Sequence, residues 1–252
     1  MIRHIEERQT NIHIGTSGWH YRHWKGTFYP KELSEKKFLD YYANHFQSVE
    51  INNSFYQIPK KESLLAWRNA VPSGFIFTVK ASRFITHRKK LKDPEETLEL
   101  FLDTISSLND KLGPVLFQLP PSWGFNAERF YDFLESLPAG FRFAFEFRNP
   151  TWNNTQAYDA LTEIGAAFCI SDYEGTLSPK NITADFVYVR LHGPDEPYRG
   201  GYSTTALSGW AGAVSAWVDQ GREVFLYFDN DEEGHAVRDA LKLKNMLNSG
   251  TR

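Results

Sequence analysis

Residues 142–148 read RFAFEFR, and this stretch indicates the fold most clearly. Side chains alternate across an extended strand, so Phe143, Phe145 and Phe147 share one face and Glu146 lies on the other. The aromatic face is suited to packing against helices. We therefore predict a strand that is covered by helices on its aromatic face and directs charge toward the inside of a barrel.

Seven other short runs along the chain resemble this one in length. They are rich in β-branched and aromatic residues, a composition that favours strands over helices. Together with 142–148, they predict eight strands. The seven runs are residues 12–15, 48–52, 75–80, 115–119, 167–171, 187–192 and 224–229.

Helical patterns separate most of these runs. Apolar residues recur at helical spacing from Leu98 to Leu108, with Asp93 expected as the N-cap, Pro94 as the first helical residue and the pair at 113–114, Gly-Pro, as the stop signal. Similar faces occur in 38–46, 207–218 and 236–247. Residues 173–185 contain Pro179 and few apolar positions, which predicts only a short helix or a loop.

Strands that alternate with helices form parallel sheets, and eight such units predict a single (β/α)8 TIM-type barrel. The 252 residues suit one domain of this kind. No Pro/Gly/Ser-rich linker, repeat or dinucleotide-binding glycine motif interrupts the pattern. We expect one domain over residues 1–252, with residues 1–10 as a polar N-terminal tail.

The charge and hydropathy of the chain narrow the possible partners. The formal net charge is −3, so a general affinity for nucleic acid or anionic membranes is not favoured. No apolar run has the length of a membrane span, and residues 1–10 lack a signal-peptide pattern. These features predict a cytoplasmic protein. The single cysteine, Cys169, lies in an apolar run and is expected to be buried.

Polar residues gather at the carboxyl ends of the expected strands, the end at which barrel enzymes carry their active sites. The alternation within each strand places them on the face opposite the aliphatic side chains. The full set is Glu50, Asn52, Lys80, Gln118, Glu146, Arg148, Asp172, Arg190, His192 and Asp229. We expect seven of them to converge in one cleft: Glu50, Asn52, Lys80, Glu146, Arg148, Arg190 and His192.

A purely structural interpretation of this set stays open. Buried charges are costly unless they are paired, so the same residues could form an internal network of ion pairs. Glu146 or Glu50 would then pair with Arg148 or Arg190.

Several motifs resemble those of the YecE-like family, whose activity is not established. The resemblance spans nearly the whole chain and implies a TIM-type barrel without implying a reaction. The matching stretches are GTSGW (15–19) with Tyr21, Trp24 and FYP (28–30); EINNSFY (50–56) with Pro59; QLPP (118–121); FEFR (145–148) with Trp152; VRLHG (189–193) with Tyr198; and YFDND (227–231) with Gly234 and Ala236.

The leading hypothesis is an enzyme of hydrolase or lyase type that uses acid–base chemistry on a small anionic or sugar-like substrate. Glu50, Glu146 and His192 are the expected catalytic residues, because carboxylates and imidazoles carry protons near neutral pH. The expected substrate-binding residues are Asn52, Tyr56, Lys80, Arg148, Arg190 and Asp229. We expect an anion to bind between Arg148 and Arg190, because guanidinium groups suit carboxylate and phosphate.

Two other classes of function remain open: a nucleic-acid-processing or nucleic-acid-binding protein, and a non-catalytic ligand-binding module. No cofactor is expected. We also expect no stoichiometric metal, because dense ligand motifs such as His-Glu-x-x-His are missing and because Lys80, Arg148 and Arg190 would repel a cation. The sequence does not indicate an oligomeric state.

Overall fold

The computed structural model describes residues 11–249. Contacts between residues divide the chain into two compact units. The first unit holds the residues up to Val49, Ile170–Ser178 and the residues from Asp185 onward. The second holds Glu50–Cys169 and Pro179–Ala184.

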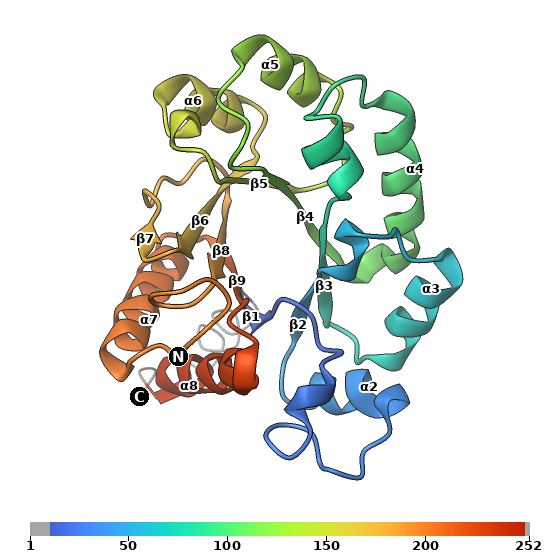
Figure 1. Ribbon diagram of the computed structural model, residues 1–252, viewed down its shortest axis with the longest axis vertical. Coiled ribbons are helices and arrows are strands. Elements are labelled where there is room, and N and C mark those ends of the chain that lie inside the picture. The colour runs from blue at the N-terminus through green and yellow to red at the C-terminus, as the bar shows by residue number, and fades with distance from the viewer. Residues whose placement is uncertain (1–10, 250–252) are drawn as a thin grey trace. The chain divides into compact units, whose positions relative to one another are not determined.

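The first unit is built on parallel strands in the order β1-β9-β8-β6. Helices α7 and α8 pack against each other and against β9, and α8 also contacts β1 (Figure 1). Its elements are β1 (Ile12–Thr16), η1 (Arg22–Trp24), η2 (Glu35–Lys37), α2 (Phe38–Ala43), β8 (Phe186–Leu191), α7 (Thr204–Asp219), β9 (Glu223–Phe228), η7 (Glu232–Gly234) and α8 (His235–Ser249).

The second unit continues the parallel order as β6-β5-β4-β3-β2, with α3 packed on α4 and α5 on α6. Strands β2 (Ser48–Ile51) and β6 (Ala167–Tyr173) run through both units. The other elements are η3 (Asn53–Phe55), α3 (Lys61–Ala70), β3 (Ile76–Lys80), η4 (Phe84–Arg88), α4 (Glu95–Ile105), η5 (Ser106–Lys111), β4 (Leu112–Leu119), α5 (Ala127–Glu135), β5 (Phe143–Phe147), η6 (Pro150–Trp152) and α6 (Thr155–Glu163).

All eight expected strands are present and parallel, and a helical segment follows each of them along the chain except β6, which leads through β7 to β8. This order is that of a (β/α)8 TIM-type barrel, so the predicted fold class is confirmed. Each strand begins and ends within a few residues of the range expected from its pattern of apolar residues.

The aromatic face of β5 packs against helices, as its alternation predicts. The ring of Phe145 contacts Phe130 and Phe133 of α5, and the ring of Phe147 stacks on Trp152 at 5.0 Å between centroids. These three aromatic partners, Phe130, Phe133 and Trp152, are fully buried in the second unit. Glu146 lies on the opposite face of β5.

Two expectations about the segment 93–114 are wrong. The N-cap of α4 is Pro94, because Asp93 takes a left-handed conformation with φ of 42° and its side chain makes no capping bond. Gly113-Pro114 does not stop the helix, which ends at Ile105; both residues lie inside β4. A Cβ on Gly113 would come within 2.6 Å of Ile76 Cγ2, so glycine is required by the close approach of β3.

The expectation of a short helix or loop over 173–185 holds for residues 178–185, which form a loop, and is wrong for residues 173–177, which form a hairpin. Strand β6 extends to Tyr173 and pairs in an antiparallel manner with a two-residue strand, β7 (Thr176–Leu177). Glu174 and Gly175 join the strands, both with positive φ, as a tight two-residue hairpin requires. The hairpin lies next to Asp172.

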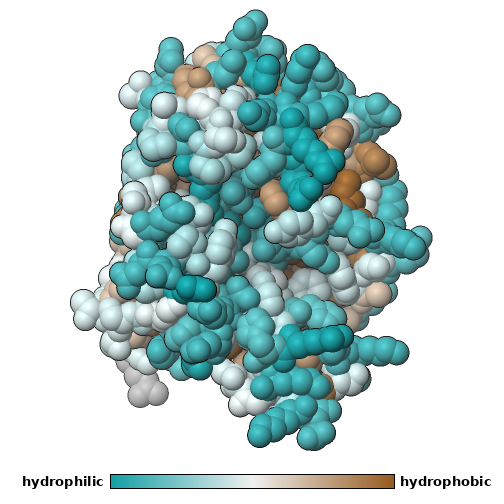
Figure 2. Space-filling view, in the orientation of Figure 1, coloured by the Kyte–Doolittle hydropathy of each residue, from teal (hydrophilic) through white to brown (hydrophobic). Residues whose placement is uncertain are grey.

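One face of the protein is mostly polar (Figure 2), and the single cysteine lies in the interior. On the face shown in Figure 2, hydrophilic side chains predominate and hydrophobic ones form small scattered patches. Cys169 is fully buried, as predicted. Among residues 11–249, no helix combines the length and apolar character needed to cross a membrane.

Candidate active-site residues in the two units

Three neighbouring strands of the first unit bring their carboxyl ends together. Leu191 at the end of β8 and Thr16 at the end of β1 both pair with Phe228 at the end of β9. The residues that follow these strand ends are Ser17, His192 and Asp229, which therefore lie side by side. Two of them, His192 and Asp229, were predicted site residues.

Arg190 connects these residues. Its side chain is fully buried, and Nη2 donates hydrogen bonds to Asp229 Oδ2 at 2.9 Å and to Ser17 Oγ at 3.1 Å. Its Nη1 lies 3.3 Å from His192 Nε2. Arg190, His192 and Asp229 thus form one network within the first unit, while the predicted convergence of all seven residues in one cleft stays a prediction.

The geometry determines the tautomer of His192. An arginine can only donate, so Nε2 of His192 accepts from Arg190 and its proton must be on Nδ1. Nδ1 lies 3.0 Å from Asp229 Oδ2, although the two atoms are not aligned as a hydrogen bond. The bonded guanidinium of Arg190 is the neighbour that favours the ionised form of Asp229.

A second carboxylate, Asp172, lies beside this network. The backbone carbonyl of Asp172 accepts a hydrogen bond from the amide of His192. Burial raises the pKa of its carboxyl group, and a hydrogen bond from Tyr202 opposes that shift. The Tyr202 hydroxyl also accepts from the amide of Gly193, so this tyrosine ties the loop after β8 to β6.

Asp231, two residues after Asp229, lines a cavity of about 770 Å³ together with His23, Tyr198 and Arg199. Its carboxylate is 3.7 Å from His23 Nε2, and its backbone carbonyl accepts a hydrogen bond from the Trp24 indole. Burial and the negative charge of Asp229 raise the pKa of Asp231 to about 6. Asp231 was not among the predicted site residues, although it lies in the YFDND motif.

In the second unit, Glu146 and Arg148 form a buried ion pair. Arg148 Nη2 lies 2.6 Å from Glu146 Oε1. The two residues share the polar face at the end of β5 because they are two positions apart. Gln118 of β4, another of the candidate residues, is the register partner of Glu146.

A group of cations surrounds His87 in the same unit. Burial lowers the pKa of His87, and the positive charges of Lys80, Arg83 and Arg148 lower it further. The Lys80 ammonium lies 4.4 Å from the centre of the Phe55 ring, which contacts His87 edge-on. Sequence reasoning missed Arg83 and His87. They follow β3 in a run of basic residues that could have drawn attention to them.

The remaining predicted residues of this unit lie at or just beyond the end of β2. Glu50 is fully buried within the strand. Asn52 follows it, and its buried Oδ1 has no hydrogen-bond donor among residues 11–249. Tyr56 is 71% exposed, with the Arg83 guanidinium 6.0 Å from its ring centre.

The predicted anion between Arg148 and Arg190 stays a prediction, since these arginines belong to different units. The expected absence of a metal also stays a prediction. In the described part of the chain, no three His, Cys, Asp or Glu side chains are grouped to hold a metal ion.

A family model described as "Protein of unknown function DUF72" matches residues 13–252. The chain belongs to the DUF72 family. The predicted resemblance to YecE-like proteins is therefore confirmed. A YecE protein of Escherichia coli is 34% identical over 44% of this chain, a match that spans 42% of the E. coli protein's length. YunF of Bacillus subtilis is 25% identical over 94% of both chains.

Solved structures of DUF72 proteins agree with the fold. The crystal structure of a DUF72 protein from Thermotoga maritima is 31% identical and has a TM-score of 0.85, covering 94% of this chain and 99% of its own. A DUF72 protein from Enterococcus faecalis, 23% identical, shares the fold with a TM-score of 0.81, covering 94% and 95%. The description of the DUF72 family assigns no reaction, so function must be argued from the residues described above.

Proposed function

We propose that this DUF72 protein is an enzyme of hydrolase or lyase type that uses acid–base chemistry on a small anionic or sugar-like substrate. The observation that carries the proposal is the contrast between Asp229 and Asp231. Asp229 accepts a hydrogen bond from Arg190 and lies 3.0 Å from His192 Nδ1. Asp231 lines a cavity and its pKa is raised to about 6.

Two carboxyl groups with different environments can divide the roles of acid and base. The bonded guanidinium of Arg190 favours the ionised form of Asp229, and the raised pKa of Asp231, about 6, gives it a larger protonated fraction near neutral pH than an ordinary aspartate has. A carboxyl group with a pKa near the working pH is an effective proton donor. In this scheme Asp231 is the general acid, and Arg190 holds Asp229 as the anion.

The walls of the cavity suit the proposed substrate class. The Tyr198 ring offers a flat face for the carbon skeleton of a sugar. Arg199 supplies a guanidinium for an anionic substituent, and carboxylates of the same cavity accept hydrogen bonds from hydroxyl groups.

The second unit supplies a group that favours anions. Burial lowers the pKa of His87, and the positive charges of Lys80, Arg83 and Arg148 lower it further, so this region favours a bound anion. Each unit keeps its own proposed substrate-binding residues: Arg190 and Asp229 in the first, and Asn52, Tyr56, Lys80 and Arg148 in the second. Glu50 and Glu146 remain proposed proton carriers, with Glu146 also positioning Arg148.

The test is a screen of sugar phosphates, glycosides and hydroxy acids for turnover, followed by Asp231→Asn. We expect this variant to lower kcat by roughly 10²- to 10⁴-fold, the usual effect of losing a general acid. Asp40→Asn, a matched change on the exposed face of α2, should leave turnover unchanged. Full activity of Asp231→Asn would overturn the assignment, and ligand binding without any turnover would favour a non-catalytic module.

One observation favours nucleic acid as a second candidate. The segment after β3 carries Arg88, Lys89 and Lys90 next to Arg83, and the rings of Phe84 and Tyr56 are exposed. Cations interspersed with exposed rings suit a single strand. Binding of a fluorescent oligonucleotide that weakens steeply with salt, and weakens further in Lys89→Gln/Lys90→Gln, would support this function. Salt-independent or undetectable binding would exclude it.

A further inference from the structure

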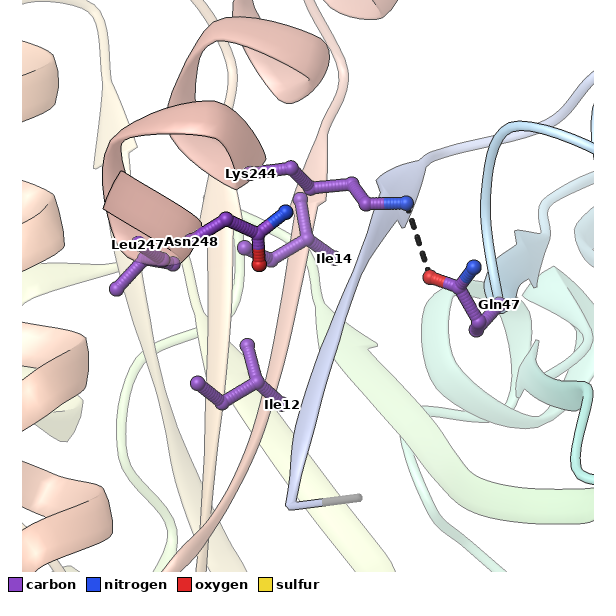
Figure 3. A pocket seen from close by; sticks show the side chains of 6 residues that line it. All are labelled: Ile12, Ile14, Gln47, Lys244, Leu247 and Asn248. Carbon is purple, nitrogen blue, oxygen red and sulfur yellow. Dashed lines mark hydrogen bonds between the residues drawn. The ribbon is translucent and has the colours of Figure 1, made fainter. Parts of the chain in front are cut away.

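Helix α8 carries a lysine whose surroundings differ from those of an ordinary surface lysine. Lys244 Nζ donates hydrogen bonds to the backbone carbonyl of His45 and, at 2.9 Å, to Gln47 Oε1, as Figure 3 shows for Gln47. It also lies 5.2 Å from the centre of the Phe46 ring. Among residues 11–249, no carboxylate lies within 4.0 Å of Nζ. The ammonium group is therefore held only by uncharged partners.

The same lysine lines a cavity of about 390 Å³ in the first unit. Ile12 and Ile14 of β1 and Leu247 of α8 form its apolar wall, and the amides of Gln47 and Asn248 are its polar groups (Figure 3). A cavity of this size accepts a molecule of a few heavy atoms that has a short carbon chain and one polar end.

Burial lowers the pKa of Lys244 to about 8, and no charged neighbour contributes to the shift. The nearest titratable side chains on the surrounding elements face other partners. On α8, Lys242 points to Asp239; beyond α2, His45 bonds the Tyr41 carbonyl; on β1, His13 bonds Glu223. A desolvated lysine of this kind supplies the neutral amine that attacks carbonyl carbon.

We propose that the cavity at Lys244 is a site where small aldehydes or ketones form an imine with the Nζ amine. The neutral amine adds to the carbonyl carbon, a C=N bond replaces the C=O bond, and the carbonyl oxygen leaves as water. The proton released when the ammonium ionises passes to solvent. The apolar wall holds the carbon chain, and the amides of Gln47 and Asn248 hold the polar end. The site uses none of the residues in the proposed active site.

Reductive trapping tests the proposal on the intact protein. We would add propanal and sodium cyanoborohydride at pH 7.5 and follow propylation of each lysine by peptide mass spectrometry. At that pH the neutral fraction of Lys244 is roughly 100-fold larger than that of a lysine with the ordinary pKa near 10.4. We expect Lys244 to be propylated at least about tenfold faster than Lys242, an exposed lysine of the same helix.

Two comparisons connect the reactivity to the fold. The rate at Lys244 should rise as pH increases through about 8, and the preference over Lys242 should disappear in a concentration of urea that unfolds the protein. Lys244→Arg keeps a donor for the His45 carbonyl and should remove the fast phase while the protein stays folded. Equal rates at Lys244 and Lys242 in the folded protein, or a preference that survives in urea, would overturn the proposal.

Discussion

Arg190 and Asp229 form an ion pair, with Nη2 and Oδ2 2.9 Å apart, and both side chains are almost completely buried. The pair joins adjacent parallel strands, because Arg190 lies in β8 and Asp229 follows β9. The structural interpretation of Arg190, an internal ion pair, therefore has direct geometric support. Arg190 would therefore affect substrate binding through the residues to which it is bonded.

Arg190→Met should lower the free energy of unfolding by about 3–5 kcal/mol, because it leaves the buried carboxylate of Asp229 without its cation. Urea denaturation measures the loss. Arg199→Met is the matched control: this arginine is 61% exposed and pairs with Glu196 at the surface, where solvent screens the pair, so its loss should change the free energy of unfolding very little. Equal stability of the two variants would show that the buried pair is not stabilising.

Asp231→Asn should change how stability depends on pH. The folded-state pKa of Asp231 is about 6, above the ordinary value near 4, so the folded protein holds this proton more tightly than the unfolded chain does. The contribution of Asp231 to stability is therefore complete below about pH 4 and is lost as pH rises through about 6, by about 2–3 kcal/mol in all. Over that pH range, the free energy of unfolding of the Asn variant, measured by urea denaturation, should rise relative to that of the unaltered protein. A constant difference from pH 4 to 7.5 would contradict the assignment.

The pKa of His87 should rise when a cation near it is removed. Lys80→Met removes one of the positive charges that lower the pKa of His87. Bound inorganic phosphate should have the same effect, because its negative charge offsets the positive charges of the cations around His87. NMR titration of the imidazole resonances measures both. Lys61→Met, which removes an exposed charge paired with Asp103, should leave His87 unchanged. A phosphate-insensitive His87 would count against anion binding here.

Two glycines of the first unit should respond to alanine in opposite directions. A Cβ at Gly15 would lie 2.2 Å from the backbone oxygen of Ser48, so Gly15→Ala must displace backbone and should destabilise the protein strongly. Gly209 lies within α7 with open space around it, and Gly209→Ala should stabilise by roughly 0.5–1 kcal/mol. Thermal or urea unfolding of both variants checks the pair. A stable Gly15→Ala protein would contradict the close approach at Ser48.

The sequence by itself determined the eight strands and the face that each presents, because alternation and helical spacing follow from local geometry. RFAFEFR shows this well: its three phenylalanines pack on aromatic partners, and Glu146 and Arg148 pair with each other. Placement of Glu146, Arg190, His192 and Asp229 at or just past strand ends was predictable for the same reason. The motifs also indicated the family.

Tertiary structure decided how the charges are used. Whether a carboxyl group is ionised depends on its neighbours in space, and Asp229 and Asp231, two residues apart, differ because only Asp229 reaches Arg190 and His192. The cations around His87 come from two separate segments of the chain, with Lys80 and Arg83 in one and Arg148 in the other. Likewise, the sequence around Lys244 predicts an ordinary surface lysine on a polar helix. Its partial burial depends on β1 and on residues 45–47, which lie about two hundred positions away in the chain. Such environments arise from contacts between distant segments, which local sequence patterns do not encode.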